Sequence, residues 1–153
     1  MSTFAFNVKV NDPFADVTDA ALGTAGQGWG DEEIGKAVKL STANNYVLCS
    51  DGDPMEGFVC AVEPNTVNAG VSFGAVQRNK RVVAVLDTGE TGVTVGTVVV
   101  AGAQAAVGTA NASSAPVVAA EPVPGTSAGN FIWRVIRLID GGDAGDRVLI
   151  ERV

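Results

Sequence analysis

Residues 45–63 read NYVLCSDGDPMEGFVCAVE, and they show the pattern that recurs along most of the chain. Two short runs rich in Val and aromatic residues flank Asp51-Gly52-Asp53-Pro54, a combination typical of a tight turn. Branched and aromatic side chains pack well on a pleated surface, so each run predicts a short strand. The stretch therefore predicts two strands joined by a turn.

Similar apolar runs, separated by Asn, Asp and Gly, continue on both sides of this stretch. Strands are expected near residues 34–40, 45–50, 55–63, 70–77, 81–86, 93–101, 131–139 and 147–153. Short strands at roughly ten-residue spacing are typical of a sandwich or small barrel. We therefore predict an all-β fold, a small β-barrel or sandwich of about eight short strands, as one domain over residues 34–153. We find no internal repeat in the sequence.

Residues 104–130 differ in composition from the rest of this domain. They are rich in Ala, Gly, Ser and Pro and contain a single charged residue, Glu121. We expect a long surface loop around a short strand at 116–120. The prolines in this stretch would place that strand at the edge of a sheet, because Pro has no N–H to donate.

Residues 1–33 are predicted to form an N-terminal strand and an extended arm. Apolar residues alternate with small or polar ones at Phe4, Phe6, Val8 and Val10. A period of two with one apolar face is typical of a half-buried strand. Residues 11–33 break the pattern with Pro, Gly and acidic residues, which predicts an irregular arm with one helical turn near residues 18–22.

Two features suggest contacts with other proteins. Trp29 has few apolar neighbours in sequence, so either it packs back onto the core or it anchors on another chain. The cluster Arg78-Asn79-Lys80-Arg81 carries three positive charges in four residues. It is either a solvated turn or an electrostatic contact with an acidic protein surface.

Charge and composition exclude several classes of function. The formal net charge is −7, which argues against nucleic-acid binding because neutralising phosphates requires a dense basic surface. The chain has no histidine, the usual general base and the commonest metal ligand. No apolar run is long enough to span a membrane, and the N-terminus lacks the pattern of a signal peptide. We therefore expect the chain to be made in a cytoplasm, with its thiols reduced.

Four groups of residues have the chemistry of a site, and a structural interpretation is favoured for each. The three aspartates of residues 140–146 lack the spacing of a calcium-binding loop and fit a hairpin turn. The acids of residues 51–56 flank a turn, and the glycines of residues 89–96 match no nucleotide-binding motif. Cys49 and Cys60 are expected to be buried as small hydrophobes. We expect no enzyme activity, metal site or cofactor.

Five segments carry a resemblance to a known family. They are GKAVKL at 35–40, YVLCSDGDPMEGFV at 46–59, VSFGAVQ at 71–77, RVVAV at 81–85 and GDRVLIERV at 145–153. In their order and spacing these segments resemble the capsid cement, or head decoration, proteins of tailed bacteriophages. The likeness covers residues 34–153 and lies in the overall order and spacing of these segments, because no short catalytic signature defines this family.

The resemblance implies a structural virion protein on the outside of the capsid. Members of the family are small β-barrel modules that commonly assemble as oligomers, often trimers, and bind the major capsid protein. The expected function is to stabilise the expanded shell by clamping neighbouring subunits. The residues expected at the capsid or subunit interface are Phe4, Phe6, Val8, Val10, Phe14, Trp29, Arg78, Lys80 and Arg81.

Three alternatives stay open at this point. Another virion role, in a tail or a head fibre, is the nearest. A small trimeric β enzyme of the dUTPase type fits the size, but the nucleotide-binding pattern of that family is missing from the sequence. A nucleic-acid module of the OB type is opposed by the negative charge and by an aromatic content of only 6%.

Overall fold

The computed structural model describes residues 17–63, 72–78, 81–123 and 131–153, which form ten strands and one 3₁₀ helix. The elements are β1 Val17–Leu22, η1 Asp31–Glu33, β2 Ala37–Leu40, β3 Tyr46–Leu48, β4 Gly57–Val62, β5 Ser72–Gln77, β6 Val82–Leu86, β7 Val98–Ala101, β8 Val117–Ala120, β9 Trp133–Leu138 and β10 Arg147–Arg152. The all-β prediction is confirmed. None of the described residues belongs to a helix long and apolar enough to cross a membrane.

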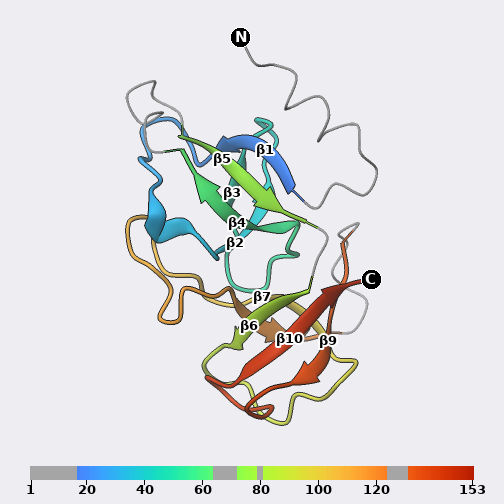
Figure 1. The fold of residues 1–153 in the computed structure, drawn as a ribbon. Helices are drawn as coiled ribbons and strands as arrows, with labels where there is room; N and C mark the ends of the chain where they lie inside the picture. The colour runs from blue at the N-terminus through green and yellow to red at the C-terminus, as the bar shows by residue number, and fades with distance from the viewer. Residues whose placement is uncertain (1–16, 64–71, 79–80, 124–130) are drawn as a thin grey trace.

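The strands form two closed five-stranded barrels (Figure 1). The first barrel has the order β1-β3-β2-β4-β5, and the second has the order β10-β6-β8-β7-β9. Each strand expected between residues 34 and 153 is present, with ends that differ by a few residues. The single domain expected there is instead the larger part of one barrel and the whole of a second.

The expected boundary at residue 33 is wrong for the described part of the N-terminal region. β1 pairs with β5 along its whole length, from Val17↔Gln77 to Leu22↔Ser72, where a helical turn was expected. The apolar residues of VTDAAL are mostly small and do not alternate, so its strand identity comes from pairing with β5 and not from local pattern. Residues 1–16, which include the predicted strand at 4–10, lie outside the described residues.

The two barrels are copies of one topology. In each, the first strand pairs parallel with the third and antiparallel with the fifth, and the second lies between the third and the fourth. The registers also correspond, because Leu22↔Tyr46 in the first barrel matches Leu86↔Val118 in the second. A bulge adds one residue to the fourth strand of each barrel, at the fourth position of that strand.

A glycine before the second strand is part of this shared geometry. Gly35 and Gly96 have φ angles of 88° and 93°, a region that favours glycine. Each donates its N–H to the carbonyl of a valine on the fourth strand, Val59 or Val135, at 2.7 Å. The sequence hides the repeat because the offset between equivalent residues changes with the loops. Residues 41–45 join β2 to β3, for example, whereas residues 102–116 join β7 to β8.

One core joins the barrels into a single body. Ala37, Cys49, Met55 and Phe58 of the first barrel belong to the same buried cluster as the interior of the second barrel. The rings of Phe58 and Trp133 meet edge to face, with centroids 4.8 Å apart. The indole Nε1 of Trp133 donates a hydrogen bond to the carbonyl of Met55 at 3.0 Å.

The matched glycines test how closely the first barrel contacts the loop that carries Ser114. At Gly96 an added Cβ meets no atom within 4 Å, so Gly96→Ala introduces backbone strain alone, about 1–2 kcal/mol. At Gly35 an added Cβ would also collide with the carbonyl oxygen of Ser114, so we expect Gly35→Ala to cost about 3 kcal/mol or more. Urea unfolding measures both free energies. Equal losses would contradict the close contact between the first barrel and the loop that carries Ser114.

Candidate functional site

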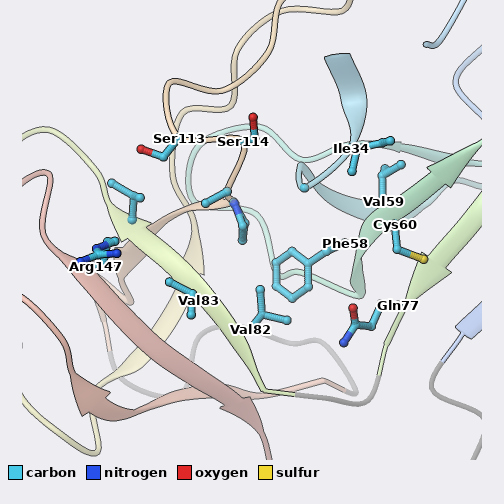
Figure 2. Close-up of a pocket in the computed structure, with 14 residues that line it drawn as sticks. Ile34, Phe58, Val59, Cys60, Gln77, Val82, Val83, Ser113, Ser114 and Arg147 are labelled. Carbon is cyan, nitrogen blue, oxygen red and sulfur yellow. The ribbon is translucent and has the colours of Figure 1, made fainter. Parts of the chain in front are cut away.

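A groove of about 480 Å³ lies at the junction of the two barrels. Figure 2 shows Phe58 and Val82 near its middle, Ser113 and Ser114 on a loop above them, and Arg147 towards one end. The first barrel also contributes residues of β4 and β5, while β6 and the loop before β8 supply the second barrel's part of the lining. The groove is therefore mainly apolar at its middle, with hydroxyl, amide and guanidinium groups around it.

A strand edge lies open along this groove. β6 pairs with β10 from Val82 to Val85, but among the described residues it pairs with β8 only at Val85 and Leu86. Alternate residues of a strand direct their backbone groups to opposite neighbours. The N–H of Val85 donates to the carbonyl of Pro116 on the β8 side, and the N–H of Leu86 donates to the carbonyl of Asp146 on the β10 side. Val83 lies two residues before Val85, so its N–H and C=O also face the β8 side. An apolar groove beside an open strand edge has the chemistry needed to bind an extended segment.

A buried ion pair holds the loop that forms one wall of the groove. Lys36 Nζ lies 3.2 Å from Glu33 Oε1, and both side chains are fully buried. Lys36 also donates to the carbonyl of Ala106 at 2.9 Å, while the N–H of Gly108 donates to Glu33 Oε1 at 2.7 Å. Gly30 donates to the second carboxylate oxygen at 2.7 Å. The pair thus ties residues 102–116 to the first barrel, a role that no pattern in the sequence predicts.

Side-chain amides organise the rest of this loop. Asn111, which is buried, accepts a hydrogen bond from the N–H of Ala105 and donates to the carbonyl of Ala115, both at 2.8 Å. The predicted strand at 116–120 is confirmed as β8, but its expected place at a sheet edge is wrong, because β8 lies between β6 and β7. Pro116 precedes the strand, so its missing N–H costs no hydrogen bond of the barrel.

The two cysteines have different environments. Cys49 is buried in the shared core, and burial foremost raises the pKa of its thiol to about 12. Cys60 was also expected to be buried, but it is exposed and lines the groove. The reason is the bulge of β4, which inserts Cys60 between residues that pair normally with β5.

The residues predicted at an interface fall into three groups. Trp29 is 1% exposed and belongs to the core of the first barrel, so of its two interpretations the structure shows packing onto the core. Arg81 is exposed and pairs with Glu151 at 3.2 Å, and Arg78 is half-buried with its carbonyl accepting from Arg152. The residues outside the described part of the chain are Phe4, Phe6, Val8, Val10, Phe14 and Lys80.

The acidic loop of residues 140–146 forms the turn between β9 and β10. Asp140 accepts two hydrogen bonds from the guanidinium of Arg147, at 2.6 and 3.0 Å, and these hold the pKa of its carboxyl below the usual value. Asp146 Oδ2 accepts from the N–H of Asp143 at 3.0 Å. Two of the three carboxylates thus serve contacts within the turn, and the described residues contain no cluster of His, Cys, Asp or Glu that could hold a metal ion.

The acids near the first turn also have structural partners. Asp53 Oδ2 accepts from Lys39 Nζ and from the N–H of Ser50, both at 2.6 Å. These contacts fit the expected role of acids in turn hydrogen bonds.

No known protein family, curated protein or solved structure matches this chain.

The buried ion pair predicts a large loss of stability when one partner is removed. Lys36→Met leaves the carboxylate of Glu33 buried without its counter-charge, which should cost about 3–5 kcal/mol. Lys39→Met is the matched control, because its pair with Asp53 is partly exposed and should contribute about 1 kcal/mol or less. Urea unfolding compares the two variants. Similar losses would show that the Glu33–Lys36 pair does not anchor the loop.

The cysteines predict one reactive thiol in the folded protein. At pH 8 a thiol reagent should modify Cys60 rapidly, because this side chain is exposed. Cys49 should react only after unfolding, since its thiol is buried and stays protonated until the pH approaches about 12. Time-resolved labelling with mass spectrometry measures both rates, and Cys60→Ser serves as the control. Rapid modification of two thiols in the native protein would contradict the shared core.

Proposed function

We propose that this protein is a capsid cement protein of a tailed bacteriophage. It binds the outer surface of the shell and stabilises the expanded form by holding neighbouring subunits of the major capsid protein together. The observation that carries the proposal is the shared core of the two barrels. A clamp must hold two contact surfaces at a fixed distance under load, and a core that runs through both barrels supplies that rigidity.

The groove supports the proposal because it offers a mode of attachment. The backbone of Val83 and the apolar side chains of Phe58 and Val82 lie where an extended segment could add a strand and bury alternate side chains. Such contacts give affinity through the backbone and need no catalytic group. The proposal accordingly assigns the protein no enzymatic role and no cofactor.

The phage assignment is supported by the resemblance of residues 34–153 to cement proteins. The thermodynamics of a shell suit it as well. A protein that binds only the expanded shell shifts the equilibrium towards that state by mass action. Assembly as a homo-oligomer, with a trimer favoured, would add avidity without any further kind of contact. In this proposal the protein resides on the exterior of the virion.

The decisive experiment mixes the purified full chain with expanded capsids that lack it. We expect added density at the junctions between capsomers in electron cryomicroscopy, and a higher temperature of capsid disruption than for bare shells. Bare shells heated alone, and shells mixed with heat-unfolded protein, are the controls. Shells without added density at saturating protein would overturn the proposal.

The structure determines where the predicted arm can be removed. Deleting residues 1–16 leaves β1, Trp29 and Glu33 in place, so the truncated protein should still unfold cooperatively in urea. If residues 4–10 act as the adhesive strand that their sequence predicts, this truncation should lose most of its capsid binding. Full occupancy of the shell by the truncated protein would refute the role of the arm. Deleting residues 1–33 would instead remove part of the first barrel and could not separate the two effects.

A further inference from the structure

The outward face of β6, β9 and β10 gathers four of the five described arginines of the second barrel, and the fifth, Arg152, is half-buried. Cross-strand pairing places Leu149 between Arg137 and Val83, with Glu151 beside Arg134. We call this surface the arginine face, and its members are Arg81, Arg134, Arg137, Arg147, Val83 and Leu149. All four arginines are exposed, and so is Val83. The face adjoins the groove, because Val83 and Arg147 also line it.

Repetition of the topology shows that the fold does not require these arginines. The positions of Arg137, Arg147 and Arg134 correspond in the first barrel to Ala61, Phe73 and Phe58. Ala61 and Phe73 are exposed and Phe58 is buried in the shared core, so the equivalent strands form the same sheet without an arginine at any of these positions. The arginines need a reason other than the stability of the barrel.

Solubility alone does not explain why the charged residues of this face are arginines and not lysines. Arginine is enriched at protein interfaces, whereas lysine is depleted there and common on the remaining surface. Within the described residues, lysine occurs only in the first barrel, at Lys36 and Lys39, and both lysines pair with acids. In the described part of the second barrel every cation is an arginine. An apolar centre with arginines around it is the composition of an interface.

Two of the four arginines have charge available for a partner. Arg81 pairs with Glu151 at 3.2 Å, and Arg147 pairs with Asp140 at 2.6 Å. Arg134 and Arg137 have no ion pair among the described residues, although the chain as a whole carries a net charge of −7. An acidic partner is repelled by most of such a protein and attracted at this face, so the charge also sets the orientation of docking.

We infer that the arginine face docks onto an acidic protein surface. The inference deepens the proposed function and rests on it for the identity of the partner, an acidic region on the outside of the capsid. Single-stranded nucleic acid is the competing polyanion. It is disfavoured because this face presents no aromatic ring on which a base could stack.

The test replaces the two unpaired arginines and measures capsid binding by co-sedimentation at low and at physiological salt. We expect Arg134→Gln with Arg137→Gln to weaken binding about tenfold at low salt and to reduce its dependence on salt. The matched control is Thr42→Glu with Ala61→Glu, which changes the net charge equally at exposed positions of the first barrel. The control should bind within about twofold of the unmodified chain.

A second measurement keeps this inference separate from the proposed function. Retention on immobilised poly-L-glutamate needs no capsid, and it should fall for the arginine variant but not for the control. If capsids bind the unmodified chain and the arginine variant equally well, the arginine face is not the docking surface, while the cement proposal stands. If no variant binds capsids but poly-L-glutamate retention depends on the arginines, the cement proposal fails and an acidic partner remains. Arginine-dependent binding to single-stranded DNA at physiological salt, as tight as that to poly-L-glutamate, would overturn the inference.

Discussion

The contact between Phe58 and Trp133 is the constraint on which the arrangement of this protein depends. Phe58 lies on β4 of the first barrel, yet it belongs to the buried cluster that fills the second. Trp133 meets its ring edge to face and donates to the carbonyl of Met55. Two aromatic rings in this geometry combine large apolar burial with a directional contact, and the indole N–H fixes the orientation further. Phe58 also lines the groove, so this contact lies directly beside it.

Because the two barrels share one topology, comparing their equivalent positions shows which residues this topology requires and which it allows to vary. Some constrained positions keep the same residue, as with Gly35 and Gly96 or Leu22 and Leu86, whereas the buried pair Tyr46 and Val118 shows that interior positions can also differ. Outward positions have diverged completely, and the equivalents of Arg137 and Arg147 are an alanine and a phenylalanine. The two barrels therefore share a topology while their exposed side chains differ.

The sequence predicted the strands well because most of them depend on local chemistry. Runs of Val between Asn, Asp and Gly predict a strand correctly without knowledge of its partner strand. β1 escaped prediction because VTDAAL has small side chains and takes its conformation from pairing with β5. The exposure of Cys60 depends on a bulge, and the open edge at Val83 depends on where β8 begins its pairing with β6. Both depend on pairing between strands that are distant in the sequence, so a local stretch of residues does not predict them.

The buried Glu33–Lys36 pair follows from the composition of the loop that it holds. Residues 102–116 are mostly Ala, Gly, Ser and Thr, which offer little apolar surface to bury against the first barrel. Val107 packs against the core of the first barrel, and the carboxylate and the ammonium hold the backbone of the loop through the N–H of Gly108 and the carbonyl of Ala106. Desolvating two charges is expensive, and the full set of hydrogen bonds offsets that cost. Apolar residues at these two positions would fill the same space but leave two backbone groups of the loop without partners, so the ion pair defines the wall of the groove more sharply than hydrophobic packing would.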